Sequence, residues 1–186
     1  QVYFEATTPT NNEFFIYMDT HSKLTLEGVG MKVPEKHQSA IGMSASELSI
    51  RNSTIFSKIK LNEGSNLTLE NVHIEKFGNN TIHAKDSEVI AKNSTITGGD
   101  LEKDFPPVWL RNVIWESENC KIELPTGTGV CLDNNVQFNS DSDHMTSINS
   151  YNSMIRAHQA TFSEFLCVYE ESFASLTGET TFLNEN

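Results

Sequence analysis

Two aspartates in one short polar segment are the side chains of this sequence best suited to chemistry. Residues 139–144 read NSDSDH, so Asp141 and Asp143 lie two positions apart and His144 follows them. Two carboxylates at this spacing offer oxygen ligands for calcium, or a pair for acid/base work. The alternative is a solvated loop, because Asp, Ser and Asn gather where a chain turns locally. The segment lacks the glycine and distal glutamate of a full calcium loop, which favours the loop. Asp141, Asp143 and His144 are therefore candidate binding residues, and calcium is the one cofactor that they suggest.

Outside this segment the sequence contains no recognisable catalytic motif. The six histidines are dispersed without a His-Glu-x-x-His spacing, and Gly-x-Ser-x-Gly is absent. No catalytic residue is therefore predicted. Trp109 lies between apolar Val108 and Leu110, so strand alternation directs its indole outward, where aromatic rings contact sugars or protein partners. Packing of Trp109 beneath the loop that carries Pro106 and Pro107 is favoured over such a contact.

The three cysteines are Cys120, Cys131 and Cys167, and an odd number argues against a full disulfide framework. Cys120 and Cys131 bracket a Pro/Gly turn at residues 124–129, and they would be placed to pair in an exported protein. The alternative is that they are small buried thiols in the core of a repeat. Because no Cys-x-x-Cys spacing occurs, no structural zinc site is predicted.

The composition restricts the classes of partner. The chain has 186 residues, with 13 Lys+Arg against 25 Asp+Glu and a formal net charge of −12. A chain this acidic repels nucleic acid and anionic membrane surfaces unless it holds a local basic patch, so no nucleic-acid partner is predicted. No apolar run approaches the roughly 20 residues that a membrane-spanning helix needs, so no membrane insertion is predicted.

An internal repeat must position these side chains. Residues 65–74 read SNLTLENVHI, and the segments 22–31, 46–55 and 87–96 align with them without a gap. Looser copies follow as far as residue 182, which gives eight copies spaced by about 19 to 24 residues. Within the first of these segments, apolar Leu67 and Leu69 alternate with polar Thr68 and Glu70. This alternation is the periodicity of a β-strand.

A one-residue corner divides each repeat into two strands. After Asn71 the alternation resumes, with Val72 and Ile74 inward and His73 outward. Asn is the non-glycine residue that best tolerates the left-handed backbone conformation of such a corner, and Gly28 occupies the same position in the first copy. We predict a stacked ladder of side-chain amides at this corner. Its members are Asn52, Asn71, Asn93, Asn112 and Asn135.

Stacking of the repeats turns each position into a column. The inward column through Ile74 is predicted to be apolar throughout, with the members Met31, Ile55, Ile74, Ile96, Trp115, Phe138, Phe162 and Phe182. The outward column through Glu70 alternates in charge and so places opposite charges on most neighbouring strands, with the members Glu27, Arg51, Glu70, Lys92 and Arg111.

Strand–Asn corner–strand coils of about this length resemble the right-handed parallel β-helices of the pectin-lyase-like superfamily, over roughly residues 22–182. That superfamily includes pectate lyases, polygalacturonases, phage tailspikes and autotransporter passengers. The resemblance implies an all-β, right-handed parallel β-helix of about eight coils. Enzymes of the superfamily act on acidic polysaccharide in a groove along one sheet. Polygalacturonases carry paired aspartates, a Gly-His-Gly and an Arg-x-Lys, and this sequence has none of these motifs. Pectate lyases carry acidic calcium ligands near a catalytic arginine or lysine, and no arginine here lies on a strand with such acidic residues.

Residues 1–20 are predicted to form strands that make either an N-terminal cap or an earlier coil, and residues 21–186 to form the β-helix. A start at Gln1 and an end directly after a repeat predict a piece of a longer protein. The coil pattern accounts for most residues, which favours a non-catalytic binding or stalk region of a secreted or surface-exposed microbial protein. Such a region would be an adhesin, a passenger or an effector docking domain, with a host or cell-surface protein or glycan as partner. The alternatives are a polysaccharide lyase or glycoside hydrolase, and a segment of a trimeric phage tail fibre.

Overall fold

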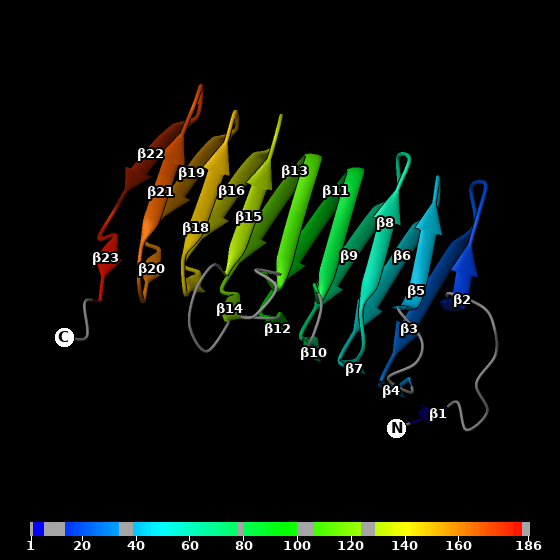
Figure 1. Cartoon of the computed structure of the whole chain (residues 1–186). Helices are drawn as coiled ribbons and strands as arrows, with labels where there is room; N and C mark the ends of the chain where they lie inside the picture. Colours follow the sequence, from blue (N-terminus) through cyan, green and yellow to red (C-terminus); the bar gives the residue numbers. More distant parts are fainter. Residues whose placement is uncertain are drawn as a thin grey trace.

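The strands of the chain stack in parallel into a right-handed β-helix of about seven turns (Figure 1). The structure is a computed structural model and describes residues 2–5, 14–33, 39–77, 80–99, 106–123 and 129–183. Among these described residues, β-strands are the only regular secondary structure. The predicted fold class is therefore confirmed, and the number of turns lies close to the eight copies of the repeat.

Each coil contributes one strand to each of three faces. Face 1 consists of β3 (Lys23–Glu27), β6 (Glu47–Arg51), β9 (Asn66–Glu70), the second halves of β11 (Ile82–Lys92) and β13 (Val108–Glu118), β16 (Gln137–Asp141), β19 (Met154–His158) and β22 (Phe173–Thr177). Face 2 consists of β1 (Val2–Glu5), β4 (Val29–Lys32), β7 (Thr54–Phe56), β10 (His73–Phe77), β12 (Thr95–Gly99), β14 (Lys121–Glu123), β17 (His144–Met145), β20 (Thr161–Phe162) and β23 (Thr181–Phe182). Face 3 consists of β2 (Phe14–Met18), β5 (Ser39–Ser44), β8 (Ile59–Asn62), the first halves of β11 and β13, β15 (Val130–Asp133), β18 (Ile148–Tyr151) and β21 (Leu166–Tyr169).

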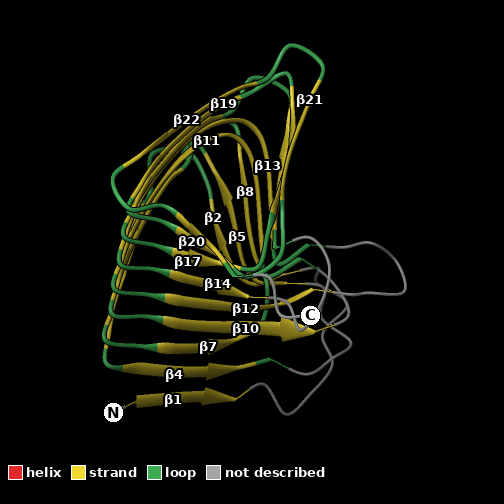
Figure 2. Cartoon of the chain, turned by 90° about the vertical axis from the view of Figure 1, so that its left-hand side faces the viewer, coloured by secondary structure: helices red, strands yellow, loops and turns green. Residues whose placement is uncertain are grey.

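The strands of face 2 lie side by side in one parallel sheet (Figure 2). Of the segment predicted as N-terminal strands, β1 pairs with β4 in this sheet and β2 pairs with β5 in face 3. These two strands therefore continue the sheets of the β-helix, and residues 6–13 between them lie outside the described residues.

Strand alternation places one side of every strand in the core. Leu67 and Leu69 are buried, whereas Asn66 and Glu70 at the ends of the same strand are exposed. Neighbouring strands are in register, so the inward side chains form continuous columns. The inward column through Leu67 has the members Leu24, Leu48, Leu67, Val89, Trp115, Phe138, Ile155 and Ala174.

The predicted column through Ile74 is correct in six members and wrong in two. Ile96 pairs with Ile122, which pairs with Met145, so these two residues take the places predicted for Trp115 and Phe138. Trp115 and Phe138 lie instead in the Leu67 column on face 1, where their rings stack with centroids 5.8 Å apart. The column through Ile74 is nevertheless apolar throughout, as predicted.

The corner between face 1 and face 2, called here the Asn corner, begins with one residue of positive φ in every described coil. Asn52, Asn71 and Asn93 occupy it with φ between 48° and 54°. Each corner amide donates to a carbonyl of the following coil, as from Asn71 N to Lys92 O at 3.1 Å. The Asn71 side chain also donates to Asn52 Oδ1 at 3.2 Å, and the Asn119 side chain donates to Asn93 Oδ1 at 3.4 Å. Three of the five predicted ladder residues therefore share this corner, and Asn119 follows them.

Asn112 and Asn135 do not belong to this ladder, which corrects the sequence-based assignment. Both lie at a second corner, between face 3 and face 1, where they also have positive φ. There the Asn112 side chain donates to Asp86 Oδ1 at 2.8 Å, and Asn135 N donates to Asn152 O at 2.9 Å. Both corners require a left-handed residue before a residue that points inward, so the local sequence does not distinguish them.

Replacing Asn71 by alanine should lower the free energy of unfolding by about 1 kcal/mol, because a Cβ-bearing residue without a local hydrogen bond is strained at positive φ. Asn71→Gly should lower it less, since glycine adopts this conformation without steric cost. Urea unfolding of both variants measures the difference. Equal losses would show that the amide contact to Asn52, and not the backbone conformation, is what stabilises the corner.

The third corner, between face 2 and face 3, varies in length. Two residues connect β7 to β8, whereas eight residues, 100–107, connect β12 to β13. The spacing of the Asn corner varies accordingly, so the irregular period of the repeat arises mainly at this third corner.

Candidate functional site

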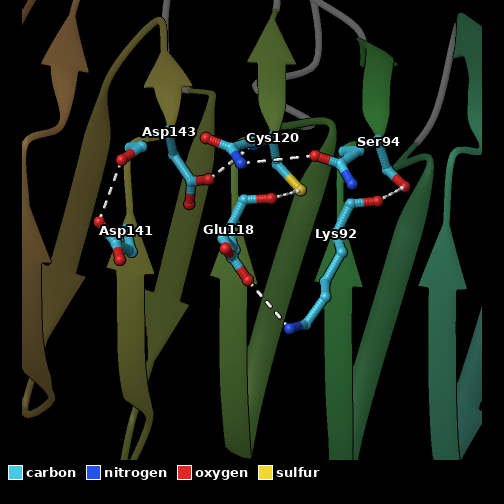
Figure 3. A network of polar contacts seen from close by, with 9 residues as sticks. Lys92, Ser94, Glu118, Cys120, Asp141 and Asp143 are labelled. Carbon is cyan, nitrogen blue, oxygen red and sulfur yellow. Dashed lines mark hydrogen bonds and ion pairs between the residues drawn. The ribbon is translucent and has the colours of Figure 1, made fainter.

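Asp143 lies inside the β-helix, at the Asn corner (Figure 3). Its side chain is buried and accepts hydrogen bonds from Cys120 N at 2.7 Å, from Ser140 Oγ at 2.8 Å and from Ser117 Oγ. Ser117 Oγ in turn accepts a hydrogen bond from Trp115 Nε1 at 2.8 Å. Asp143 therefore joins two neighbouring coils through a buried polar network in a core that is otherwise mainly apolar.

Burial raises the pKa of the Asp143 carboxyl above its usual value, because removal from water disfavours the charged form. The hydrogen bonds from Ser117, Cys120 and Ser140 act in the opposite direction and do not offset burial. A carboxylate held in this way stabilises the contact between coils only as long as all of its donors are in place.

The sequence explains why an acidic side chain points inward here. Ser142 occupies the Asn corner with φ of 55°, so the residue after it faces the core. In other coils a serine at this inward position accepts a hydrogen bond from the backbone of the preceding coil. Val29 N donates to Ser53 Oγ at 3.0 Å, and Val72 N donates to Ser94 Oγ at 3.2 Å. Asp143 occupies the same position as these serines and accepts in the same way from Cys120 N. Because an Asn-Ser pair recurs at the corner, Ser142-Asp143 could have been recognised from sequence as a corner residue followed by an inward one.

The three candidate residues of the polar segment do not converge on one site. Asp141 ends β16 and is exposed on face 1, Asp143 is buried, and His144 lies on face 2, with Nε2 3.1 Å from Ser163 Oγ. The alternating aspartates therefore do not form the carboxylate pair that was considered as an alternative to a loop, because the left-handed corner at Ser142 separates their directions. Among the described residues, no three His, Cys, Asp or Glu side chains gather in a way that would hold a metal ion.

A groove of about 460 Å³ lies on face 1 and crosses the strands β11, β13, β16, β19 and β22. Its lining carries both signs of charge, from Lys92, Glu118, Asp141, Arg156 and His158 among others. Lys92 Nζ lies 2.9 Å from Glu118 Oε2, and this hydrogen bond raises the pKa of Lys92. Glu118 takes the place in the outward column that was predicted for Arg111, and its neighbour in the next coil is Asp141. The alternation of charge therefore ends within the groove.

Arg156 differs from the two other arginines. Arg51 Nε lies 3.3 Å from Glu70 Oε2, and the Arg111 guanidinium bonds Asp133 with Nε at 3.1 Å from Oδ2. Arg156 is exposed in the groove, and no hydrogen bond or ion pair joins its side chain to any other residue that the structure describes. Its five N–H donors are thus directed to the solvent that fills the groove.

Trp109 lies outward on face 3, as the alternation predicts, and is partly buried. Its ring centroid is 4.4 Å from that of His83 and 5.1 Å from the Arg111 guanidinium carbon. Burial, together with the positive charges of Lys58, Lys60 and Arg111, lowers the pKa of His83 to about 4. Three cationic side chains therefore lie near the His83 ring, and one of them, Arg111, is also paired with Asp133.

None of the three cysteines forms a disulfide bond with another described residue. Cys120 is buried at the Asn corner, and burial raises its pKa to about 11, so it remains a thiol at neutral pH. Cys131 lies on face 3, which separates it from Cys120, so the pairing considered for these two cysteines is not formed.

Comparison of the chain with protein-family models, with curated proteins and with solved structures finds no significant match. In the described part of the chain, no helix is long and apolar enough to cross a membrane. Two surfaces could hold a ligand: the groove on face 1, and the region around Trp109 and His83 on face 3.

Proposed function

We propose that this chain is a non-catalytic binding region of a secreted or surface-exposed microbial protein, and that it engages a host or cell-surface protein or glycan through the groove on face 1. The observation that carries the proposal is the groove itself, which crosses five strands and contains the exposed guanidinium of Arg156. The core of a β-helix holds such a face rigid, so weak contacts along it add without a large ordering cost.

The lining of the groove supports a polar ligand. Guanidinium and ammonium donors lie beside carboxylate acceptors, and the partly exposed Ile90 adds apolar surface. This mixture matches the rim of a protein interface or the hydroxyl groups of a glycan, in which donors and acceptors alternate.

Arg156→Ala should weaken capture of the ligand by about tenfold or more, because it removes a set of donors from the centre of the interface. The measurement is a pull-down and a glycan array with the purified chain, with calcium and with chelator. Arg51→Ala is the matched control, since Arg51 is an exposed arginine of the same face that is paired with Glu70 and lies outside the groove. Equal losses from the two variants would contradict a role for the groove.

A second candidate function rests on face 3. Trp109, His83 and the positive charges around them favour an acidic glycan, the substrate class of a polysaccharide lyase or glycoside hydrolase. In the same array, acidic glycans would then be retained, and Trp109→Ala rather than Arg156→Ala would abolish retention. Release of reducing or unsaturated ends from those glycans would identify an enzyme, whereas retention without product would identify a binding face.

A further inference from the structure

The groove on face 1 continues toward the N-terminus as a second hollow. This hollow has a volume of about 400 Å³ and crosses β3, β6, β9 and β11. Ile90 lines both hollows, so together they cross every described strand of face 1. Because neighbouring strands lie about 4.8 Å apart, the combined depression is about 34 Å long. A ligand that fills it must be extended along the axis of the β-helix.

Several charges of face 1 already have an opposite charge beside them. Three ion pairs join outward side chains of neighbouring strands, the third of which is drawn in Figure 3: Lys23–Glu47 at 2.8 Å, Arg51–Glu70 at 3.3 Å and Lys92–Glu118 at 2.9 Å. These six side chains therefore need no countercharge from a ligand.

Four charged side chains of the two hollows have no such partner. They are the carboxylates of Glu88, Glu116 and Asp141 and the guanidinium of Arg156, and no ion pair joins any of them to another residue that the structure describes. Asp141 accepts a hydrogen bond from the adjacent Ser142 hydroxyl at 3.1 Å, which leaves its charge uncompensated. Glu88 is partly exposed and the other three are exposed, so a ligand in the depression can reach all four.

The register of face 1 arranges these charges in a series. Glu116 lies one strand after Glu88 and two residues further along, and Asp141 lies in the same way relative to Glu116. Arg156 lies on the strand after Asp141, two residues before the position in register with it. Successive members are therefore about 8 Å apart, and the series consists of three negative charges followed by one positive charge.

We propose that the ligand of this groove is an extended segment of a partner protein, with basic side chains opposite Glu116 and Asp141 and an acidic side chain opposite Arg156. This assignment rests on the proposed function and decides between the protein and the glycan as its ligand. A protein segment supplies both signs of charge along one chain. An acidic glycan would satisfy Arg156 and would be repelled by the three carboxylates, and a neutral glycan would leave all four charges uncompensated.

The spacing of the charges fits an extended chain. Alternate side chains of such a chain lie on one side about 7 Å apart, and the long stems of lysine and arginine cover the difference from about 8 Å. Ile90 neighbours both Glu88 and Glu116, and it offers apolar surface to the aliphatic stems. Exposed ion pairs are individually weak and are screened by salt, so the affinity should come from several pairs together and should fall as the salt concentration rises.

Fluorescence anisotropy with labelled synthetic peptides of about ten residues tests the proposal, since about ten extended residues span the depression. The first peptide carries lysines at alternate positions and two glutamates at one end, and the second has these two charges exchanged throughout. The purified chain should bind the first peptide about tenfold or more tightly than the second, and high salt should weaken this binding.

Variants of the chain locate the contact. Asp141→Lys should weaken binding of the first peptide by about tenfold or more, because it places like charges together. Glu27→Lys is the matched control, since Glu27 is an exposed carboxylate of the same outward column that lies outside both hollows. Asp141→Asn removes the charge with little change of shape and serves as the second variant if Asp141→Lys does not fold by circular dichroism. Arg156→Glu should reverse the preference between the first peptide and one whose two glutamates are replaced by lysines.

Equal affinity for the first two peptides would overturn the proposal, as would equal losses from Asp141→Lys and Glu27→Lys. The glycan array described above separates this result from a failure of the proposed function. Glycan binding that is lost in Arg156→Ala, without binding of the peptides, would overturn the assignment of a protein segment and leave the groove as a ligand site. Absence of binding to every peptide, protein and glycan would overturn both.

Discussion

Ile74→Asp is expected to abolish folding or to lower the free energy of unfolding by about 4 kcal/mol or more, because it buries a carboxylate in an apolar column. Ile74 is 0% exposed, and its neighbours above and below are Ile55 and Ile96, which are buried as completely. No polar group of that column is available to pair with the new charge. Circular dichroism and urea unfolding of the purified variant measure the loss.

His73→Asp is the matched control, since it introduces the same charge one residue earlier on the same strand. His73 points outward between Thr54 and Thr95 and is partly exposed, so the free energy of unfolding should change by less than about 1 kcal/mol. Losses of similar size from the two variants would refute the assignment of inward and outward positions on face 2.

Asp143→Ala should be the next most severe single change, with a loss of about 2 to 4 kcal/mol in the free energy of unfolding. The substitution leaves Cys120 N and the hydroxyls of Ser117 and Ser140 without their acceptor in a buried site, and each buried unpaired group costs about 1–3 kcal/mol. Asp143→Asn keeps the shape and an acceptor for Cys120 N, and the hydroxyls can rotate to accept from its amide. It should therefore be much milder in urea unfolding at neutral pH.

The same pair of variants gives a pH dependence of known sign. The folded chain binds the Asp143 proton more tightly than the unfolded chain does, because burial raises the pKa of this carboxyl from 3.8. The stabilisation that comes from this tighter proton binding is complete below pH 3.8, and it is lost as the pH rises through the raised pKa of the folded chain. The difference in unfolding free energy between wild type and Asp143→Asn should therefore shift against the wild type with rising pH over this window. A constant difference would contradict the raised pKa.

The sequence predicts the architecture because strand alternation and the Asn corner are local patterns. Leu67 and Leu69 alternate with polar residues, and Asn71 marks the corner, so the inward positions of this coil follow directly. The C-terminal half is harder to align. Asn112-Val113 at the second corner looks like Asn71-Val72 at the Asn corner, so the local sequence places Asn112, and likewise Asn135, at the wrong corner.

The same ambiguity affects residues 139–144. A carboxylate pair or calcium site there requires the side chains of Asp141 and Asp143 to lie on the same side, and the alternative is a solvated loop. Because the corner residue is Ser142, Asp141 ends a strand of face 1 and Asp143 turns into the core. Arg156 could not have been found from sequence, since its exposure in a groove depends on the spacing of five coils.

The largest changes in coil length in this protein occur at one edge. The connections at the Asn corner stay between one and three residues long, and one residue with positive φ begins each of them. The connection between face 2 and face 3 already ranges from two to eight residues without disturbing the pairing of the strands that it joins. Evolution can therefore lengthen or replace that edge coil by coil while the groove on face 1 keeps its spacing. A peptide tag grafted at the same edge would be carried by the β-helix without altering its core.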